Sequence, residues 1–137
     1  MTEDPINLDC EQLQEMISVA PFHQWLDLEV KSCIDGELQL LMPWRGEIVS
    51  NPTIGGAHGG ILAALVDLTG FYALVAAGVK LKATADLRVD YHRPATSGPL
   101  TATGRIIKIG RQISVAEAHI ASPEGKLVAS GRGAYTC

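Results

Sequence analysis

The sequence predicts an α+β protein in which a curved antiparallel sheet of five or six strands wraps round one long central helix. Two observations lead to this fold class. Residues 59–78 are apolar on nearly every side, which is typical of a buried helix. Segments of alternating apolar and polar residues surround this run and are separated by turn sequences, which indicates antiparallel strands. We expect residues 1–137 to form a single domain, with residues 1–21 as an N-terminal extension that contains a short helix.

Composition limits the classes of function. The chain has 137 residues and is 47% hydrophobic, enough for one domain with a sizeable core. Its net charge of −4 argues against nucleic acid as a partner. The three cysteines lack metal-binding spacing, so we expect reduced thiols and no metal site. Residues 1–5 are acidic, unlike a signal peptide, and we therefore expect a cytoplasmic protein.

Two elements are expected before the central helix. Residues 9–19 form a short amphipathic helix with Asp9 as its cap, and Pro21 ends it. The apolar side of this helix consists of Leu13, Met16 and Ile17. Residues 25–42 alternate in polarity around Asp35-Gly36, a strong two-residue turn signal, and predict a hairpin. Residues 43–52 form a loop that leads to the central helix.

The central helix has a flexible start at His58-Gly59-Gly60 and a stop signal at Gly78. Its only carboxylate is Asp67, and a charge inside a buried helix is costly unless it is paired or used. Helical spacing places small or chemically distinct residues on one face: Gly60, Ala63, Ala64, Asp67, Gly70 and Phe71. A membrane span is the alternative for such a run, but its glycines and Asp67 argue against one.

Four strands follow the helix, over residues 84–91, 100–109, 112–121 and 126–135. In the first of them, strict alternation would place Thr84 on the face opposite Leu87 and Val89. A sheet of this size leaves part of a long apolar helix uncovered. We therefore expect a second copy of the chain to cover the rest, which gives a symmetric homodimer.

Several motifs occur in order over residues 22–135. They are Asn51-Pro52, His58-Gly59-Gly60, Asp67 nine residues after His58, residues 83–95, Gly110-Arg111 and residues 125–129. In this order and spacing the chain resembles hotdog-fold acyl-CoA thioesterases of the PaaI-like branch, which act in phenylacetate degradation. The resemblance implies dimers that often build tetramers, and a site at the dimer interface. It also implies hydrolysis of an acyl-CoA thioester to a free acid and CoA without a metal or bound cofactor.

The resemblance also implies roles for individual residues. Asp67 takes the position of the catalytic carboxylate, and Gly59 that of the backbone N–H that polarises the thioester carbonyl. Thr84 takes the position of a hydroxyl that helps to place the attacking water. Asn51 is near the position of a catalytic amide, which often lies six residues before the histidine, whereas Asn51 lies seven residues before His58.

The chemistry of these residues fits that reaction. A helix N-terminus supplies unpaired N–H groups and partial positive charge, and glycine at Gly59 and Gly60 lets a carbonyl approach them. Asp67 could act as a general base or as a nucleophile, and we favour the general base because Thr84 offers a second hydrogen-bonding group for water. His58 could be a ligand or an acid, or could orient the loop. The candidates for contact with CoA phosphates are Arg88, Arg93, Arg111 and Lys126.

Three alternatives stay open. Asp67 could be a structural acid paired with Arg88 or Arg93. The protein could be a hotdog-fold acyl-CoA hydratase or dehydratase, which needs a histidine and an acid to move protons to and from carbon. It could also bind acyl-CoA without turnover, although the chain has no room for a helix-turn-helix beside the single domain.

Overall fold

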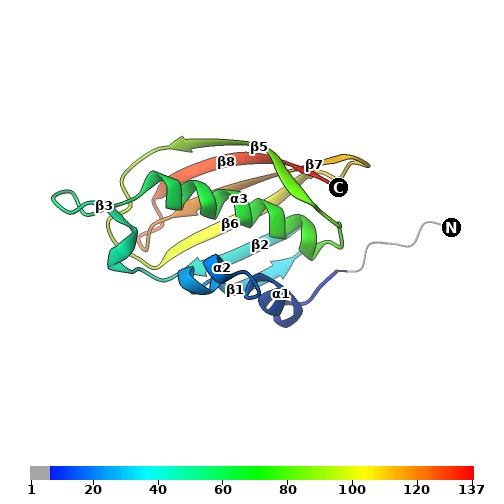
Figure 1. Ribbon diagram of the computed structural model, residues 1–137, viewed down its shortest axis with the longest axis horizontal. Coiled ribbons are helices and arrows are strands. Elements are labelled where there is room, and N and C mark those ends of the chain that lie inside the picture. The colour runs from blue at the N-terminus through cyan, green and yellow to red at the C-terminus, as the bar shows by residue number, and fades with distance from the viewer. Residues whose placement is uncertain (1–6) are drawn as a thin grey trace.

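The computed structural model describes residues 7–137, so the acidic residues 1–5 lie outside it. The elements occur in this order: α1 (Cys10–Ile17), α2 (Pro21–Leu26), β1 (Glu29–Ile34), β2 (Glu37–Met42), the 3-10 turn η1 (Gly46–Ile48), β3 (Val49–Asn51), β4 (Gly56–Ala57), α3 (Gly59–Ala76), β5 (Ala83–Tyr91), β6 (Leu100–Lys108), β7 (Ile113–Ala121) and β8 (Leu127–Thr136) (Figure 1).

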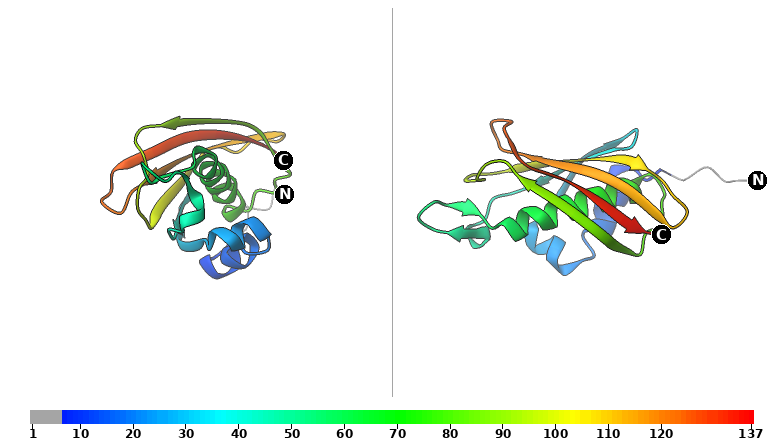
Figure 2. Two further views of the ribbon diagram at one scale, coloured as in Figure 1. Left: turned by 60° about the vertical axis from the view of Figure 1, so that its left-hand side comes forward. Right: turned by 90° about the horizontal axis from the view of Figure 1, so that it is seen from above.

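The main sheet has six antiparallel strands in the order β1-β2-β6-β7-β8-β5. It curves over α3, while α1 and α2 lie near the β1 end of the sheet (Figures 1 and 2). This arrangement is the hotdog fold, and it confirms the predicted α+β class. β5 forms one edge of the sheet, so one side of its backbone has no strand beside it within residues 7–137.

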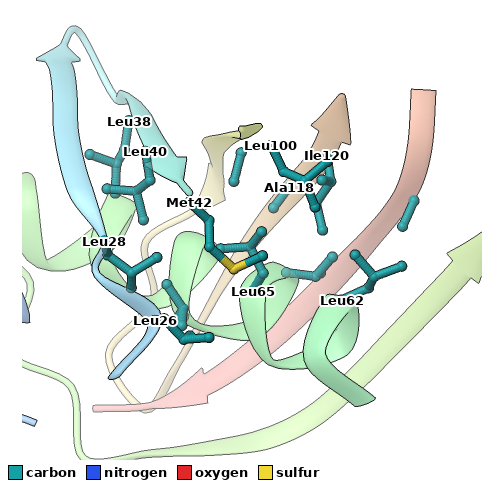
Figure 3. Close-up of a cluster of buried hydrophobic side chains, with 14 of the residues drawn as sticks. Leu26, Leu28, Leu38, Leu40, Met42, Leu62, Leu65, Leu100, Ala118 and Ile120 are labelled. Carbon is teal, nitrogen blue, oxygen red and sulfur yellow. The ribbon is translucent and has the colours of Figure 1, made fainter. Parts of the chain in front are cut away.

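The core is the contact between α3 and the sheet. α3 packs on β6, β7 and β8, and its leucines meet apolar side chains from β2 and from the helix α2 (Figure 3). Among the described residues, α3 is the one helix long and apolar enough to cross a membrane, and here it is the core helix of the domain.

Helix α3 ends at Ala76, two residues before the predicted stop at Gly78. Gly78 has φ +88°, and two backbone bonds, Gly78 N–H to Val75 and Val79 N–H to Leu74, satisfy the last carbonyls.

The N-terminal prediction was partly wrong. Asp9 caps α1 through a reciprocal bond with Gln12, as expected. Met16, however, is 45% exposed rather than buried beside Leu13 and Ile17. Pro21 begins the second helix α2 instead of only ending the first, because proline suits the first position of a helix. The predicted hairpin therefore starts at Glu29, and the short strands β3 and β4 occupy part of the predicted loop and the glycine-rich stretch after it.

The three cysteines are free thiols. The Sγ atoms of Cys10 and Cys33 lie 3.9 Å apart. Burial, reinforced by the neighbouring Cys10 thiol, raises the pKa of Cys33 to about 11. The nucleophilic thiolate is therefore a very small fraction of Cys33 at neutral pH, and this residue is a poor candidate for a catalytic nucleophile.

A buried tyrosine ties the end of β8 to α3. Tyr135 is completely buried, and its hydroxyl donates to the backbone carbonyl of Asp67 at 2.8 Å. The ring lies over Gly133, two residues earlier on the same face of β8, where an added Cβ would overlap the Tyr135 Oη and Cζ atoms. A Cβ at Gly70, on the facing helix, would lie 2.6 Å from Tyr135 Oη. Gly70 therefore belongs to the face against the sheet rather than to the open face with Asp67.

The crowding at Gly133 leads to a prediction about stability. Gly133→Ala should lower the free energy of unfolding by about 1–3 kcal/mol, because the tyrosine ring must leave its buried position. Urea unfolding at fixed protein concentration measures this loss. Gly46→Ala is the matched control, since a Cβ at Gly46 meets no atom within 4 Å. Equal stabilities of the two variants would contradict the assigned position of Tyr135.

Candidate active site

The first feature of the site is the N-terminus of α3. His58 is the cap residue, and its Nδ1 accepts a hydrogen bond from the Gly60 N–H at 2.9 Å. Because a backbone N–H can only donate, Nδ1 carries no proton while this bond exists. His58 therefore caps and orients the helix start, and the Gly60 N–H is not free for a substrate.

The Gly59 N–H differs from its neighbour. It donates no hydrogen bond to any acceptor within residues 7–137. Gly59 lines a pocket of about 390 Å³ together with residues from β3, β4, β5 and the loop after β5. The pocket is mixed in character, with Leu62 and Ile54 as apolar lining and Asn51 and Arg93 as polar lining. An unpaired donor at a helix N-terminus beside a pocket is a suitable partner for a developing oxyanion.

Asp67 is half-buried in the middle of α3. Its Oδ1 accepts a hydrogen bond from the Thr84 hydroxyl at 2.7 Å. Asp67 forms no ion pair with any residue of the described chain, so neither Arg88 nor Arg93 holds it as a structural acid. A half-buried carboxylate with a single hydroxyl donor and no cation is a suitable general base.

The contact with Thr84 depends on a β-bulge that the alternation pattern did not predict. Thr84 pairs with Tyr135 and Asp86 pairs with Ala134, so Ala85 has no partner in the β5–β8 ladder. The extra residue reverses the alternation at this point. Thr84 consequently faces α3 together with Leu87, on the same side of the sheet, and the expectation that it lies on the opposite face was wrong.

Tyr135 is a site residue that was missed in the sequence. Its hydroxyl fixes the backbone of Asp67, and burial together with the charge of Asp67 raises the pKa of Tyr135 well above its usual range. The hydroxyl therefore stays protonated and remains a donor at neutral pH. The available signal was the alternate glycines Gly131 and Gly133 before it, because glycines on one face of a strand mark close approach of another backbone.

Gly59 and Asp67 are not brought together within one chain. They are eight residues apart on the same helix, which corresponds to about 12 Å along its axis. A general base must lie within about 3–3.5 Å of the attacking water, and an oxyanion donor must lie equally close to the carbonyl oxygen that this water attacks. A single chain supplies both groups, but about 12 Å of helix separates the residues that carry them.

The predicted binding residues are distributed over the molecule. Arg93 lines the pocket beside Gly59. The side chain of Arg88 is 79% exposed on the outer face of the sheet and lies 3.6 Å from Asp90. Arg111 lies in the turn between β6 and β7. Asn51 lines the pocket, and its Oδ1 accepts from the Thr53 N–H at 3.0 Å in a local turn.

Comparisons with known proteins place the chain in a family. The family model described as "Thioesterase superfamily" matches residues 54–129, which include both Gly59 and Asp67. A relative from Halobacterium salinarum that carries an esterase name is 36% identical over 81% of this chain and 80% of its own. The medium/long-chain acyl-CoA thioesterase YigI of Escherichia coli K12 is 27% identical over 84% of each chain.

Solved structures give the same result. A protein from the thioesterase superfamily superposes with a TM-score of 0.89 at 40% identity, over 93% of this chain and 97% of that one. The PaaI protein of the E. coli phenylacetic acid degradation operon superposes with a TM-score of 0.81 at 26% identity, over 92% and 90%. The fold is thus that of a hotdog protein of the thioesterase type. The chain belongs to the thioesterase superfamily.

The hydrogen bond between Thr84 and Asp67 can be tested with a matched pair of variants. A hydrogen bond to a charged group is worth about 1.5–3 kcal/mol, so Thr84→Val, which keeps the shape but removes the hydroxyl, should lower kcat about 10- to 100-fold. Thr84→Ser keeps the hydroxyl and should retain most of the activity. Steady-state kinetics of both variants measure the difference, and a loss in Thr84→Ser as large as or larger than that in Thr84→Val would contradict the role of the hydroxyl.

Proposed function

We propose that this protein is an acyl-CoA thioesterase that hydrolyses a thioester to a free carboxylic acid and CoA. The observation that carries the proposal is Asp67, a half-buried carboxylate with a hydroxyl donor and no cation, on a helix whose N-terminus holds an unpaired Gly59 N–H beside a pocket. Membership of the thioesterase superfamily and the YigI likeness support the choice of substrate class.

The proposed reaction uses these groups in order. The thioester carbonyl oxygen accepts a hydrogen bond from the Gly59 N–H. Asp67 accepts a proton from a water molecule that Thr84 helps to place, and the water oxygen attacks the carbonyl carbon. The tetrahedral oxyanion forms against the Gly59 N–H, where one such donor is worth about 2.7–4 kcal/mol. The C–S bond then breaks, the CoA thiolate leaves, and the proton held by Asp67 passes to its sulfur, which regenerates the carboxylate.

The distance between Gly59 and Asp67 supports a homodimer as the active unit. We propose that Gly59 of one protomer and Asp67 of the other act on the same thioester, because the helix separates them by about 12 Å within a chain. The free edge of β5 and the half-buried face of α3 are the surfaces available for such a two-fold contact. Association of two dimers into a tetramer stays a prediction from the family resemblance.

The test is hydrolysis of a panel of acyl-CoAs that includes short, medium, long and aromatic acyl groups, followed by reaction of the released CoA with a thiol reagent. Turnover of at least one member supports the proposal. Inactivity towards the whole panel, with intact fold and tight acyl-CoA binding, would favour a non-catalytic binding protein. A single turnover in H₂¹⁸O separates the two roles of Asp67, because only a nucleophilic carboxylate takes up the label.

The hydratase or dehydratase alternative is less well supported. That chemistry needs a histidine that exchanges protons with carbon, and the Nδ1 of His58 is already bonded to the Gly60 N–H. An assay of crotonyl-CoA hydration, monitored as a loss of absorbance, would detect this activity. We expect no hydration.

A further inference from the structure

The peptide unit between Gly59 and Gly60 is held at both of its ends. Its carbonyl, from Gly59, accepts a hydrogen bond from the Tyr91 hydroxyl at 2.7 Å. Its N–H, from Gly60, donates to His58 Nδ1 at 2.9 Å. The two side chains come from different parts of the chain, one from the end of β5 and the other from the residue before α3. Together they fix the orientation of one peptide plane.

This peptide needs such support because it joins two glycines. Glycine has the greatest backbone freedom of any residue, and a helix start is prone to fraying. His58 also takes up space that a Cβ at Gly60 would need, whereas a Cβ at Gly59 would make ordinary contact with the Tyr91 ring. A Cβ at Gly59 would lie 3.4 Å from the Tyr91 ring, and one at Gly60 would lie 3.1 Å from His58 Nδ1. The glycine at position 60 therefore admits His58, and the two side chains restrict the peptide between the glycines.

The position of Tyr91 on β5 relates this contact to Asp67. Tyr91 and Thr84 lie at the two ends of β5 and both face α3, because the bulge at Ala85 brings Thr84 to that side. β5 thus meets α3 at the start of the helix and again at Asp67. Tyr91 is 54% exposed, so its hydroxyl is not part of the buried core.

We propose that Tyr91 is a positioning residue that, with His58, aims the Gly59 N–H at the substrate carbonyl. The Tyr91 and His58 hydrogen bonds form a clamp on the Gly59–Gly60 peptide unit. The free N–H of Gly59 belongs to the peptide unit directly before it. The clamp therefore restricts the backbone on both sides of that N–H. The Tyr91 proton is used in the bond to Gly59, so Tyr91 itself is not the oxyanion donor. This role rests on the proposed thioesterase reaction.

Kinetics of Tyr91→Phe provide the first test. Loss of the hydroxyl should lower kcat about 3- to 10-fold, the equivalent of one neutral hydrogen bond, with KM changed less than twofold. His58→Ala should have a similar effect, and the double variant should lose little more than the worse single variant, because both bonds act on one peptide plane. Unchanged kcat in Tyr91→Phe, or multiplicative losses in the double variant, would overturn the proposal.

A second measurement does not depend on activity. In protein labelled with ¹⁵N-glycine, the amide of Gly60 should exchange with solvent at least threefold faster in Tyr91→Phe than in the wild type. Tyr72→Phe is the matched control, since no hydrogen bond involves the Tyr72 hydroxyl within the described chain, and its exchange rates should match the wild type. Unchanged exchange at Gly60 in Tyr91→Phe would overturn the clamp, whereas an inactive wild type with faster exchange in the variant would overturn only the thioesterase proposal.

Discussion

Replacement of Asp67 by alanine should lower kcat for acyl-CoA hydrolysis about 10³-fold, because positioned general bases contribute about 10²- to 10⁴-fold. Asp67→Asn should show a similar loss, since the amide keeps the size of the side chain but cannot take up a proton. Initial rates of CoA release under saturating substrate measure both variants. Turnover within tenfold of the wild type in either variant would exclude Asp67 as the base.

Stability separates this role from a structural one. Asp67 has no cation partner in the described chain and occupies the middle of an otherwise apolar helix. Alanine is the best helix former, so Asp67→Ala should unfold at the same or a higher urea concentration than the wild type. A structural acid would behave in the opposite way, because its removal leaves a buried partner unsatisfied. Loss of activity without loss of stability is the combination expected at a catalytic position.

The central helix was predictable because its pattern does not depend on the rest of the chain. An apolar run with glycines at both ends and one carboxylate inside it predicts a buried helix and a site together. The α3 boundaries differ from the prediction only where the turn at Gly78 closes the helix. The strands after α3 were also found within two residues, since their alternation and turns are local features.

Features that depend on contacts between distant residues could not be predicted. The bulge at Ala85 exists only through pairing with β8, so alternation alone assigned Thr84 to the wrong face. The short helix α2 is too brief to show a helical period, and its last two residues, Trp25 and Leu26, fall inside the predicted hairpin. The roles of His58 and Tyr91 at the helix start rest on side-chain hydrogen bonds that sequence spacing does not show.

Replacement of Gly59 by proline should lower kcat about 10²- to 10³-fold, because it deletes the proposed oxyanion donor. Proline is well tolerated at the first position of a helix, and His58, with ψ 132°, already has the extended conformation that a residue before proline requires. Gly59→Ala is the matched control, because it adds a Cβ near Tyr91 but keeps the N–H, and it should lose less than tenfold. Equal losses in the two variants would assign the effect to crowding.

The two inactive variants also test where the site is formed. If Gly59 of one protomer acts with Asp67 of its partner, a mixed dimer of Gly59→Pro and Asp67→Ala chains contains one intact site and one site with both defects. Random assembly after refolding an equimolar mixture makes half of the dimers mixed, so about a quarter of the wild-type activity should return. A site contained within one chain predicts no recovery at all. Because each variant alone is inactive, any activity regained on mixing must come from a site that two protomers share.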